Sequence, residues 1–285
     1  MDVEPIIANT IKDIRRHVAS ARSEGKTIAL VPTMGALHEG HASLFQAAAA
    51  CDFVVASIFV NPTQFGPQED LARYPRSPQA DLALCRDNGV HAVFMPETEE
   101  MYPPGWLTEV SVGKLDANLC GRSRPGHFTG VATVVAKLFN IVAPDKAFFG
   151  AKDYQQTVVI RRMTLGLNYP VEIVVCPTVR HGDGLAVSSR NTYLSAEHRK
   201  QATSLWGALE MVASLIRRRR PPTEEVVATI REHLATHAPE GVVDYIQIVD
   251  PADLTDVRTT KRAVLVALAV NFGTTRLIDN VLVGP

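Results

Sequence analysis

The arrangement of short apolar runs between residues 27 and 176 constrains the fold of this chain more than any other feature. The runs are rich in Val, Ile, Ala and Phe, and a segment of helical character separates each run from the next. Short runs that are apolar on both faces are typical of strands buried in a parallel sheet. Such strands are expected at residues 27–31, 53–60, 92–95, 147–149 and 171–176. Their alternation with helices predicts a doubly wound, Rossmann-like parallel sheet and hence an α/β fold.

Helices fill most of the intervals between these strands. Asn9-Thr10 can cap a first helix that runs to about residue 23, where Gly25 is a plausible stop. Further helices are expected directly after His41 and at residues 80–88, 131–142 and 154–165. Residues 96–125 contain several Pro and Gly residues and are expected to be mostly irregular, with room for one short strand.

The pattern changes after Asn191. Ser195 is expected to cap a helix that runs to about residue 218, and a second helix is expected at residues 223–237. Three β-rich runs follow, at residues 243–249, 263–270 and 277–283. We therefore expect a Rossmann-like domain at residues 1–180 and a smaller α+β domain at residues 181–285, with the boundary between residues 177 and 188. The basic run at residues 217–220 is expected at a helix end, where it complements the helix dipole.

The overall charge gives no reason to expect binding to nucleic acid or to a membrane. The chain has 29 basic and 30 acidic residues, so no global field draws it to a polyanion. Its four cysteines (Cys51, Cys85, Cys120 and Cys176) lie far apart without C-x-x-C spacing, which favours reduced core thiols and a cytosolic protein. No signal peptide is visible at the N-terminus, and no apolar run reaches the length of a membrane span.

Polar clusters follow four of the predicted strands, where ligands bind to open α/β sheets. The first is His38-Glu39-Gly40-His41, at the start of a helix. A helix start offers unpaired N–H groups and a partial positive charge, and residues three apart share one face of its first turn. This combination predicts a triphosphate site. Two alternatives stay open: a zinc site, although the zincin signature H-E-x-x-H is one residue longer, and a purely structural helix cap.

Three more clusters follow later strands. The neutral amides of Asn61-Pro62-Thr63-Gln64 suit hydroxyl groups and carboxylates, unless the segment is an ordinary Asn-Pro turn. Residues 150–156 combine a glycine, a lysine suited to phosphate and an aspartate suited to ribose hydroxyls; the alternative is a helix cap at Asp153. Residues 187–191 place two serines and an arginine after the Gly-containing residues 182–184, unless they are a plain linker. Four such clusters together favour one shared site.

Several motifs resemble the pantothenate synthetase (pantoate–β-alanine ligase) family. They are VPTMGALHEGH, FVNPTQFG, RPGHFTGV, FFGAKDYQQ, PTVR followed by DGLAVSSRN, and the late GTTRLIDN, and they span residues 26–280. The HEGH element alone is typical of the wider HIGH-type nucleotidyltransferase superfamily, whereas the ordered set is far more specific. The resemblance implies ATP-dependent condensation of (R)-pantoate with β-alanine to give pantothenate, through a pantoyl adenylate, with release of pyrophosphate and AMP. It also implies that Mg²⁺ accompanies the ATP, and that the protein is a cytoplasmic homodimer whose small domain serves as a lid or in dimerisation.

The resemblance further implies roles for individual residues. The catalytic residues would be His38, His41, Lys152 and Arg190. The ATP-binding residues would be Met34, Gly35, Ala36, Leu37, Glu39, Gly40, Gly150, Ala151, Asp153, Val179, Val187, Ser188 and Ser189. Pantoate and β-alanine would meet Pro32, Asn61, Gln64, Arg124, His127 and Gln156. No protein ligand to the metal is assigned.

Three positions depart from the family pattern. Ala151 stands where the family often has Glu or Lys, Val187 stands where Met is common, and His181-Gly182 replaces a more acidic pair. None of these departures removes a charged group with an assigned role.

Two other functions stay open. One is a nucleotidyltransferase of the same superfamily that acts on another acid or on a phosphate; the amides of Asn61, Gln64 and Gln156 argue against a phosphate acceptor, which would need more basic residues. The other is a nucleotide-sensing or scaffold protein that binds ATP without turnover. The presence of His41, Lys152 and Arg190 together argues against it, because decayed sites tend to lose their charges.

Overall fold

The computed structural model describes residues 4–67 and 69–284, which divide into two compact units. Unit 1 consists of the described part of residues 1–113 together with residues 124–151 and 159–177. Unit 2 consists of residues 114–123 and 152–158 and the described residues from Thr178 onward. Within the described ranges, no helix is both long enough and apolar enough to cross a bilayer.

Unit 1 is built on a six-stranded sheet in the order β1-β4-β3-β2-β5-β6, and every neighbouring pair is parallel. The strands are β1 (Ile6–Ala8), β2 (Ile28–Thr33), β3 (Phe53–Ile58), β4 (Ala92–Phe94), β5 (Lys146–Gly150) and β6 (Glu172–Cys176). This parallel sheet confirms the predicted α/β class. The sequence does not reveal β1, because it is only three residues long and two of them are exposed.

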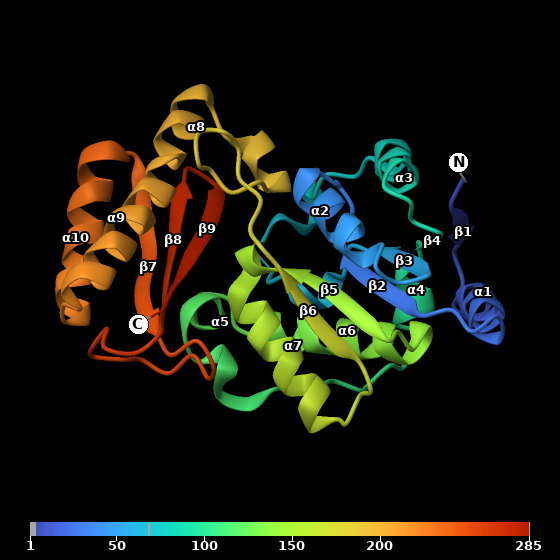
Figure 1. Cartoon of the computed structure of the whole chain (residues 1–285). Coiled ribbons are helices and arrows are strands. Elements are labelled where there is room, and N and C mark those ends of the chain that lie inside the picture. Colours follow the sequence, from blue (N-terminus) through green and yellow to red (C-terminus); the bar gives the residue numbers. More distant parts are fainter. Residues whose placement is uncertain (1–3, 68, 285) are drawn as a thin grey trace. The chain divides into compact units, whose positions relative to one another are not determined.

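Helices cover both faces of this sheet (Figure 1). Residues alternate along β2, so Ala29 and Val31 point to one face, where they share a core with α2 (Glu39–Ala48) and α3 (Pro78–Asp87). On the other face, α1 (Ile11–Ser23) and α6 (His127–Val142) pack against each other and against β2. The remaining longer helix, α7 (Tyr154–Gly166), leads from β5 to β6. Its length and position agree with the predicted helix at residues 154–165.

The stretch at residues 96–125 differs from the prediction. It contains the short helices α4 (Thr98–Met101), η3 (Gly113–Asp116) and α5 (Leu119–Ser123), and no strand among its residues. The predicted short strand is therefore wrong. The helix expected from residue 131 begins earlier, at His127, because Gly126 takes a left-handed conformation (φ 81°) that starts it and Gly130 does not break it.

The order of the strands reverses beside β2. On one side of it lie β3 and β4, and on the other side lie β5 and β6. Ile28 and Thr33 of β2 are in register with Phe53 and Ile58 of β3, and the middle of β2 pairs with the start of β5. The carboxyl ends of β2, β3 and β5 are consequently neighbours at a topological switch point, which is where open α/β sheets bind ligands.

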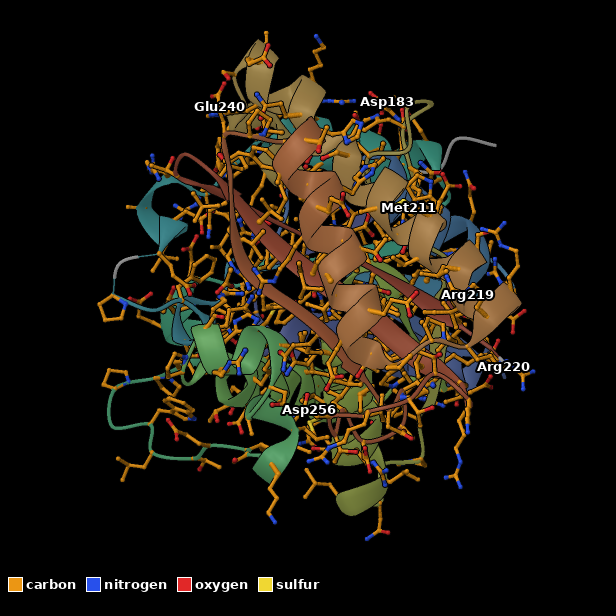
Figure 2. All side chains as sticks on the ribbon, turned by 90° about the vertical axis from the view of Figure 1, so that its left-hand side faces the viewer. Asp183, Met211, Arg219, Arg220, Glu240 and Asp256 are labelled. Atoms are coloured by element: carbon orange, nitrogen blue, oxygen red, sulfur yellow. The ribbon has the colours of Figure 1, made fainter. Side chains whose placement is uncertain are left out.

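Unit 2 is built on the antiparallel sheet β7 (Gly241–Val249), β8 (Val264–Phe272) and β9 (Thr275–Val283), in that order. Two helices, α9 (Ser204–Arg219) and α10 (Thr223–His237), lie side by side against this sheet (Figure 2). Helices packed on an antiparallel sheet confirm the predicted small α+β unit. Arg219 and Arg220 lie at the C-terminal end of α9, as expected for the basic run.

One helix of unit 2 differs from the prediction. The single helix expected from Ser195 is two helices, α8 (Ala196–Ala202) and α9, which meet at Thr203. The hydroxyl groups of Thr203 and Ser204 donate to the carbonyl oxygens of Lys200 and Gln201, and such bonds compete with a continuous helix.

Candidate active site

The loop between β2 and α2 bends through two successive left-handed residues. Gly35 has φ 82° and Ala36 has φ 49°, a conformation that costs free energy for any residue but glycine. Asp81 of α3, only 2% exposed, holds this loop by accepting hydrogen bonds from the N–H groups of Ala36 (3.1 Å) and Leu37 (2.7 Å). Burial raises the pKa of Asp81, because the two N–H donors only partly replace the lost water. The loop is therefore a shaped backbone that a remote carboxylate holds in place.

The two histidines of the first motif cap α2. His38 is the N-cap, and its Nδ1 accepts from the N–H of Gly40, while Nδ1 of His41 accepts from the N–H of His38, both at 3.2 Å. The ring centroids are 4.1 Å apart, so the rings lie together as the spacing predicts. The structure therefore shows that His38 and His41 cap the helix, and a role in phosphate binding stays a prediction. In the neutral rings these bonds assign the proton to Nε2, so each histidine offers a donor of the kind that binds phosphate oxygen.

Packing within the protein favours glycine at position 40. A Cβ atom there would lie 3.0 Å from the ring of His38, so glycine makes room for the capping histidine. Glu39 is exposed in the first turn of α2, where its charge complements the helix dipole.

The amides that follow β3 form a small network. Asn61 is 1% exposed and uses its whole hydrogen-bonding capacity: it donates to Gln64 Oε1 (3.1 Å) and to the Gly130 carbonyl (3.2 Å), and accepts from Thr63 and Tyr102. Gln64 in turn directs Nε2 to Sδ of Met34, 3.0 Å away. Asn61 thus orients Gln64, and Gln64 lies beside the residue that opens the β2–α2 loop.

Arg124 and His127 gather around the backbone of Gln64. The guanidinium group of Arg124 binds both carboxylate oxygens of Glu69 (2.7 and 2.5 Å) and donates to the Gln64 carbonyl (3.3 Å). Nδ1 of His127 lies 2.8 Å from the same carbonyl oxygen. Burial alone would raise the pKa of Glu69, but its hydrogen bonds and the charge of Arg124 outweigh burial and hold the pKa below its ordinary value. Unit 1 therefore contains a cation, Arg124, that binds the carboxylate of Glu69 in this structure.

The end of β5 supplies open backbone next to β2. Apart from its two chain neighbours, no described residue has an atom within 4 Å of a Cβ built on Gly150, so packing does not require glycine there. Ala151 follows in the short helix η4 (Ala151–Asp153), and Pro32 lies partly buried near the end of the neighbouring β2.

In unit 2, two adjacent glutamines have different tasks. Gln155 is buried and binds the backbone of residues 115, 118 and 120 with three hydrogen bonds of 2.8–2.9 Å, which makes it structural. Gln156, to which the family resemblance assigns a substrate contact, is only half-buried. Lys152 keeps 21% of its side chain exposed, and its ammonium group lies 3.6 Å from Asp153, a long and weak ion pair.

The segment from Val179 to Arg190 also lies in unit 2. Val187 donates from its N–H to the Val179 carbonyl (3.0 Å), and residues 180 and 186 form a β-bridge, so the chain folds back on itself. Ser188 then caps the short helix η5 (Ser189–Tyr193) by accepting from the N–H of Arg190 at 3.3 Å. Val187 is buried at 6% exposure, so the departure from Met is a change inside the fold.

Each unit thus assembles part of the predicted site. Unit 1 brings together the β2–α2 loop, the amides and the basic pair; these are residues 34–41, 61, 64, 124 and 127, with Pro32, Gly150 and Ala151 at the adjoining strand ends. Unit 2 carries Lys152, Asp153, Gln156, Val179, Val187, Ser188, Ser189 and Arg190. Among the described residues, no three His, Cys, Asp or Glu side chains form a group that could hold a metal ion.

Sequence reasoning misses three residues that shape unit 1. Asp81 is an acidic residue on the buried face of α3, one turn before buried Cys85, and this misplaced charge is a detectable signal. Tyr102 and Glu69 lie in irregular segments, where no periodicity marks them. Burial raises the pKa of Tyr102, and its hydroxyl group donates to Asn61 at 2.7 Å.

Comparison with known proteins gives a consistent result. The sequence pattern that defines the family described as pantoate-beta-alanine ligase matches residues 6–282. The pantothenate synthetase of Moorella thermoacetica is 54% identical over 97% of this chain and 98% of its own length, and that of Acetivibrio thermocellus is 49% identical over 97% and 99%.

Solved structures agree with these relatives. The pantothenate synthetase of Thermus thermophilus superposes with a TM-score of 0.93 at 45% identity, over 98% of this chain and all of that one. The pantoate-beta-alanine ligase of Francisella tularensis, solved with "Beta-gamma ATP" and beta-alanine, has a TM-score of 0.80 at 34% identity, over 98% and 97% of the two chains.

Proposed function

The chain belongs to the pantoate–β-alanine ligase family, and we propose that it joins pantoate to β-alanine in two steps, through a pantoyl adenylate, with the residues described above. In the first step a pantoate carboxylate oxygen attacks the α-phosphorus of ATP, and pyrophosphate leaves. In the second step the amine of β-alanine attacks the carbonyl carbon of the mixed anhydride, loses a proton and displaces AMP. The observation that carries the proposal is the switch point of unit 1, where the histidine-capped loop, the amides and the Gly150 backbone follow three adjacent strands.

The chemistry of the first step requires cations. A carboxylate and a triphosphate repel each other, and this repulsion must be screened before the oxygen can approach phosphorus. The Nε2 donors of His38 and His41, the N–H groups at the start of α2, Lys152 and Arg190 would distribute the charge that develops on the phosphate oxygens. Met34, Gly35, Ala36, Leu37, Glu39 and Gly40 would form the wall of the ATP site, with Gly150, Ala151, Asp153, Val179, Val187, Ser188 and Ser189.

Pantoate needs to be held without losing the nucleophilicity of its carboxylate. A neutral amide can bind a hydroxyl or carboxylate group without the tight ion pair that an arginine would form. Gln64, oriented by Asn61, and Gln156 suit this role, with Pro32 as an apolar wall. Arg124 and His127 would then face the carboxylate of β-alanine, for which Glu69 is a chemical stand-in.

Mg²⁺ is proposed to enter with ATP as the counterion of its phosphates. Mg²⁺ keeps several waters and binds substrate phosphates readily, so we expect phosphate oxygens and water to supply most of its ligands. When bound, it adds Lewis-acid stabilisation to the charge already spread by the protein.

We also propose a cytoplasmic homodimer. The four cysteines are free and buried, which suits a reducing compartment. Strand β6 is an edge strand with partly exposed apolar residues, and Leu165 and Leu167 nearby are 71% and 49% exposed, so a second copy could cover them. Light scattering on the wild type and on Leu165→Asp tests this, and a wild-type monomer would contradict it.

Residues 1–180 are proposed to bind nucleotide and pantoate, and residues 181–285 to act as a lid or in dimerisation.

A pyrophosphate-release assay tests the reaction. Purified protein receives ATP, Mg²⁺ and one of several hydroxy acids, with or without β-alanine. We expect release with pantoate alone, limited to about one pyrophosphate per site, and continuous release when β-alanine is added. Release that requires β-alanine would contradict the stepwise route, and preference for another acid would contradict the substrate.

A further inference from the structure

The late motif at residues 273–280 has no part in the chemistry proposed above, yet three of its side chains bind segments far away in sequence. Two of them, Asp279 and Asn280, lie next to each other on β9. We propose that they are positioning residues: Asn280 fixes the backbone of Lys152, and Asp279 fixes the turn that leads to Ser188–Arg190. The inference rests on the proposed function, because it assigns these segments to the nucleotide.

Asn280 holds the residue that carries the phosphate-binding charge. Its Nδ2 donates to the carbonyl oxygen of Lys152 at 2.8 Å, across 128 positions of sequence. The ion pair of Lys152 with Asp153 is long, at 3.6 Å, and cannot by itself set the direction of the ammonium group. A hydrogen bond to the carbonyl fixes the backbone from which the side chain departs, and therefore sets where the lysine can reach.

Asp279 holds the folded-back segment through Arg180. The carboxylate is 3% exposed and binds the guanidinium group at 2.6 and 2.8 Å, and one of its oxygens also accepts from the N–H of Asn280. Arg180 donates as well to the Gly184 carbonyl at 3.1 Å, and its guanidinium carbon lies 3.6 Å from the ring centroid of Trp206. A paired, stacked guanidinium of this kind has little freedom, so residues 180–184 are fixed to β9.

The turn itself leaves little room for another arrangement. Gly184 has φ 91°, and a Cβ atom there would lie 2.4 Å from Trp206, so the turn rests directly on that ring. Ser188–Arg190 lie four to six residues after Gly184, and the helix they enter, η5, also packs against β9.

One strand therefore sets the relation between two nucleotide-binding segments. Adjacent residues of a strand point to opposite faces, so Asp279 and Asn280 reach different partners from a single rigid backbone. The pantoate amide network of Asn61 and Gln64 belongs to unit 1 and has no member on β9. Gln156, which is also assigned to pantoate, lies in unit 2 four residues after Lys152. Loss of the Asn280 bond should thus affect steps that involve ATP more strongly than the response to pantoate concentration.

The test compares Asn280→Ala with Asn271→Ala, a half-buried asparagine on the neighbouring strand β8 of the same sheet. Pyrophosphate release is measured as a function of ATP and of pantoate, with thermal unfolding of each variant. We expect kcat/KM for ATP to fall about tenfold in Asn280→Ala, the loss typical of one hydrogen bond, with a clearly smaller change in the KM for pantoate and with Asn271→Ala like wild type. Asp279→Asn, which keeps one oxygen acceptor, should lose activity toward ATP in the same way. Equal losses for ATP and pantoate, or no loss, would overturn the proposal.

A double variant shows whether Asn280 acts through Lys152. Binding of ATP is measured by calorimetry for wild type, Asn280→Ala, Lys152→Ala and the double variant. We expect Asn280→Ala to weaken binding in the wild-type background and to add nothing when Lys152 is already alanine. A full additional loss in the double variant would contradict the positioning role. Because this experiment measures binding, it decides the inference even if the wild type releases no pyrophosphate, a result that would instead contradict the proposed function.

Discussion

The β2–α2 loop of unit 1 and the Lys152 segment of unit 2 are held in different ways. In the loop, most of the shape is local: Gly35 and Ala36 bend the backbone, and His38 and His41 cap the helix that follows, with one remote carboxylate, Asp81. In unit 2, the backbone of Lys152 is held by Asn280, 128 positions later. The turn at residues 180–184 is held by Asp279, 99 positions after Arg180.

This difference indicates how sensitive each part of a site is to single substitutions. A locally built loop is fixed by its own conformational preferences and needs few partners, whereas a remotely held segment depends on single hydrogen bonds to a distant strand. Substitutions at the chemical groups, at the remote holders and at the substrate amides should therefore have graded effects.

Lys152→Ala is expected to have the largest effect. Removal of one group that stabilises developing phosphate charge costs about 10²–10³-fold in rate, and pyrophosphate release should fall by that factor. The fold should survive, because the side chain is partly exposed and its ion pair is weak. Lys146→Ala, which removes an exposed ion pair with Glu172, is the matched control. Near-normal turnover of Lys152→Ala would remove its assigned role and, with it, the purpose of the Asn280 bond.

The same difference explains what the sequence predicts and what it does not. Parallel strands, Thr10 as a helix cap and the paired histidines carry signals within a few residues, and the structure has them at the predicted places. The three-residue strand β1 and the division at Thr203 carry weak local signals and are missed. Asp81 and Asp279 act across large sequence separations, and no pattern in one sequence says which backbone group each will bind.

Asp81→Asn should be the next most damaging change. An amide has only one oxygen acceptor, so at least one of the N–H groups of Ala36 and Leu37 loses its partner, and the strained loop relaxes. A shift of about 1 Å in a group that positions substrate can cost up to about 10²-fold in rate, so kcat/KM for ATP should fall by 10-fold or more. The exposed Asp87→Asn on the same helix is the control, and equal behaviour of the two variants would show that the loop holds its shape alone.

Gln64→Ala should have a smaller and more selective effect. The amide is expected to contribute one hydrogen bond to pantoate, so the KM for pantoate should rise about tenfold while the KM for ATP stays the same. Gln46→Ala, an exposed glutamine on α2, controls for the loss of an amide elsewhere. A change in the KM for ATP alone would contradict the assignment of Gln64 to pantoate. It would indicate instead that Gln64 acts on the β2–α2 loop.

The Glu69–Arg124 pair should give the smallest effect, and it tests whether a remote contact within unit 1 behaves like those of unit 2. The folded pKa of Glu69 is below its ordinary value of 4.5, so the ionised carboxylate stabilises the folded state. This stabilisation is fully present above pH 4.5 and is lost as the pH falls through the folded pKa. Its magnitude should be about 1 kcal/mol, because both side chains are partly accessible.

The measurement is the free energy of unfolding of wild type and Glu69→Gln between pH 3 and pH 7. Other carboxylates titrate in the same range, so only the difference between the two proteins reports on Glu69. That difference should be constant above pH 4.5 and shrink below it, because Glu69 loses its charge there whereas glutamine is neutral at every pH. A difference that grows toward low pH would mean that the ionised carboxylate destabilises the folded state. In that case Arg124 would be held by the Gln64 carbonyl and His127 rather than by Glu69.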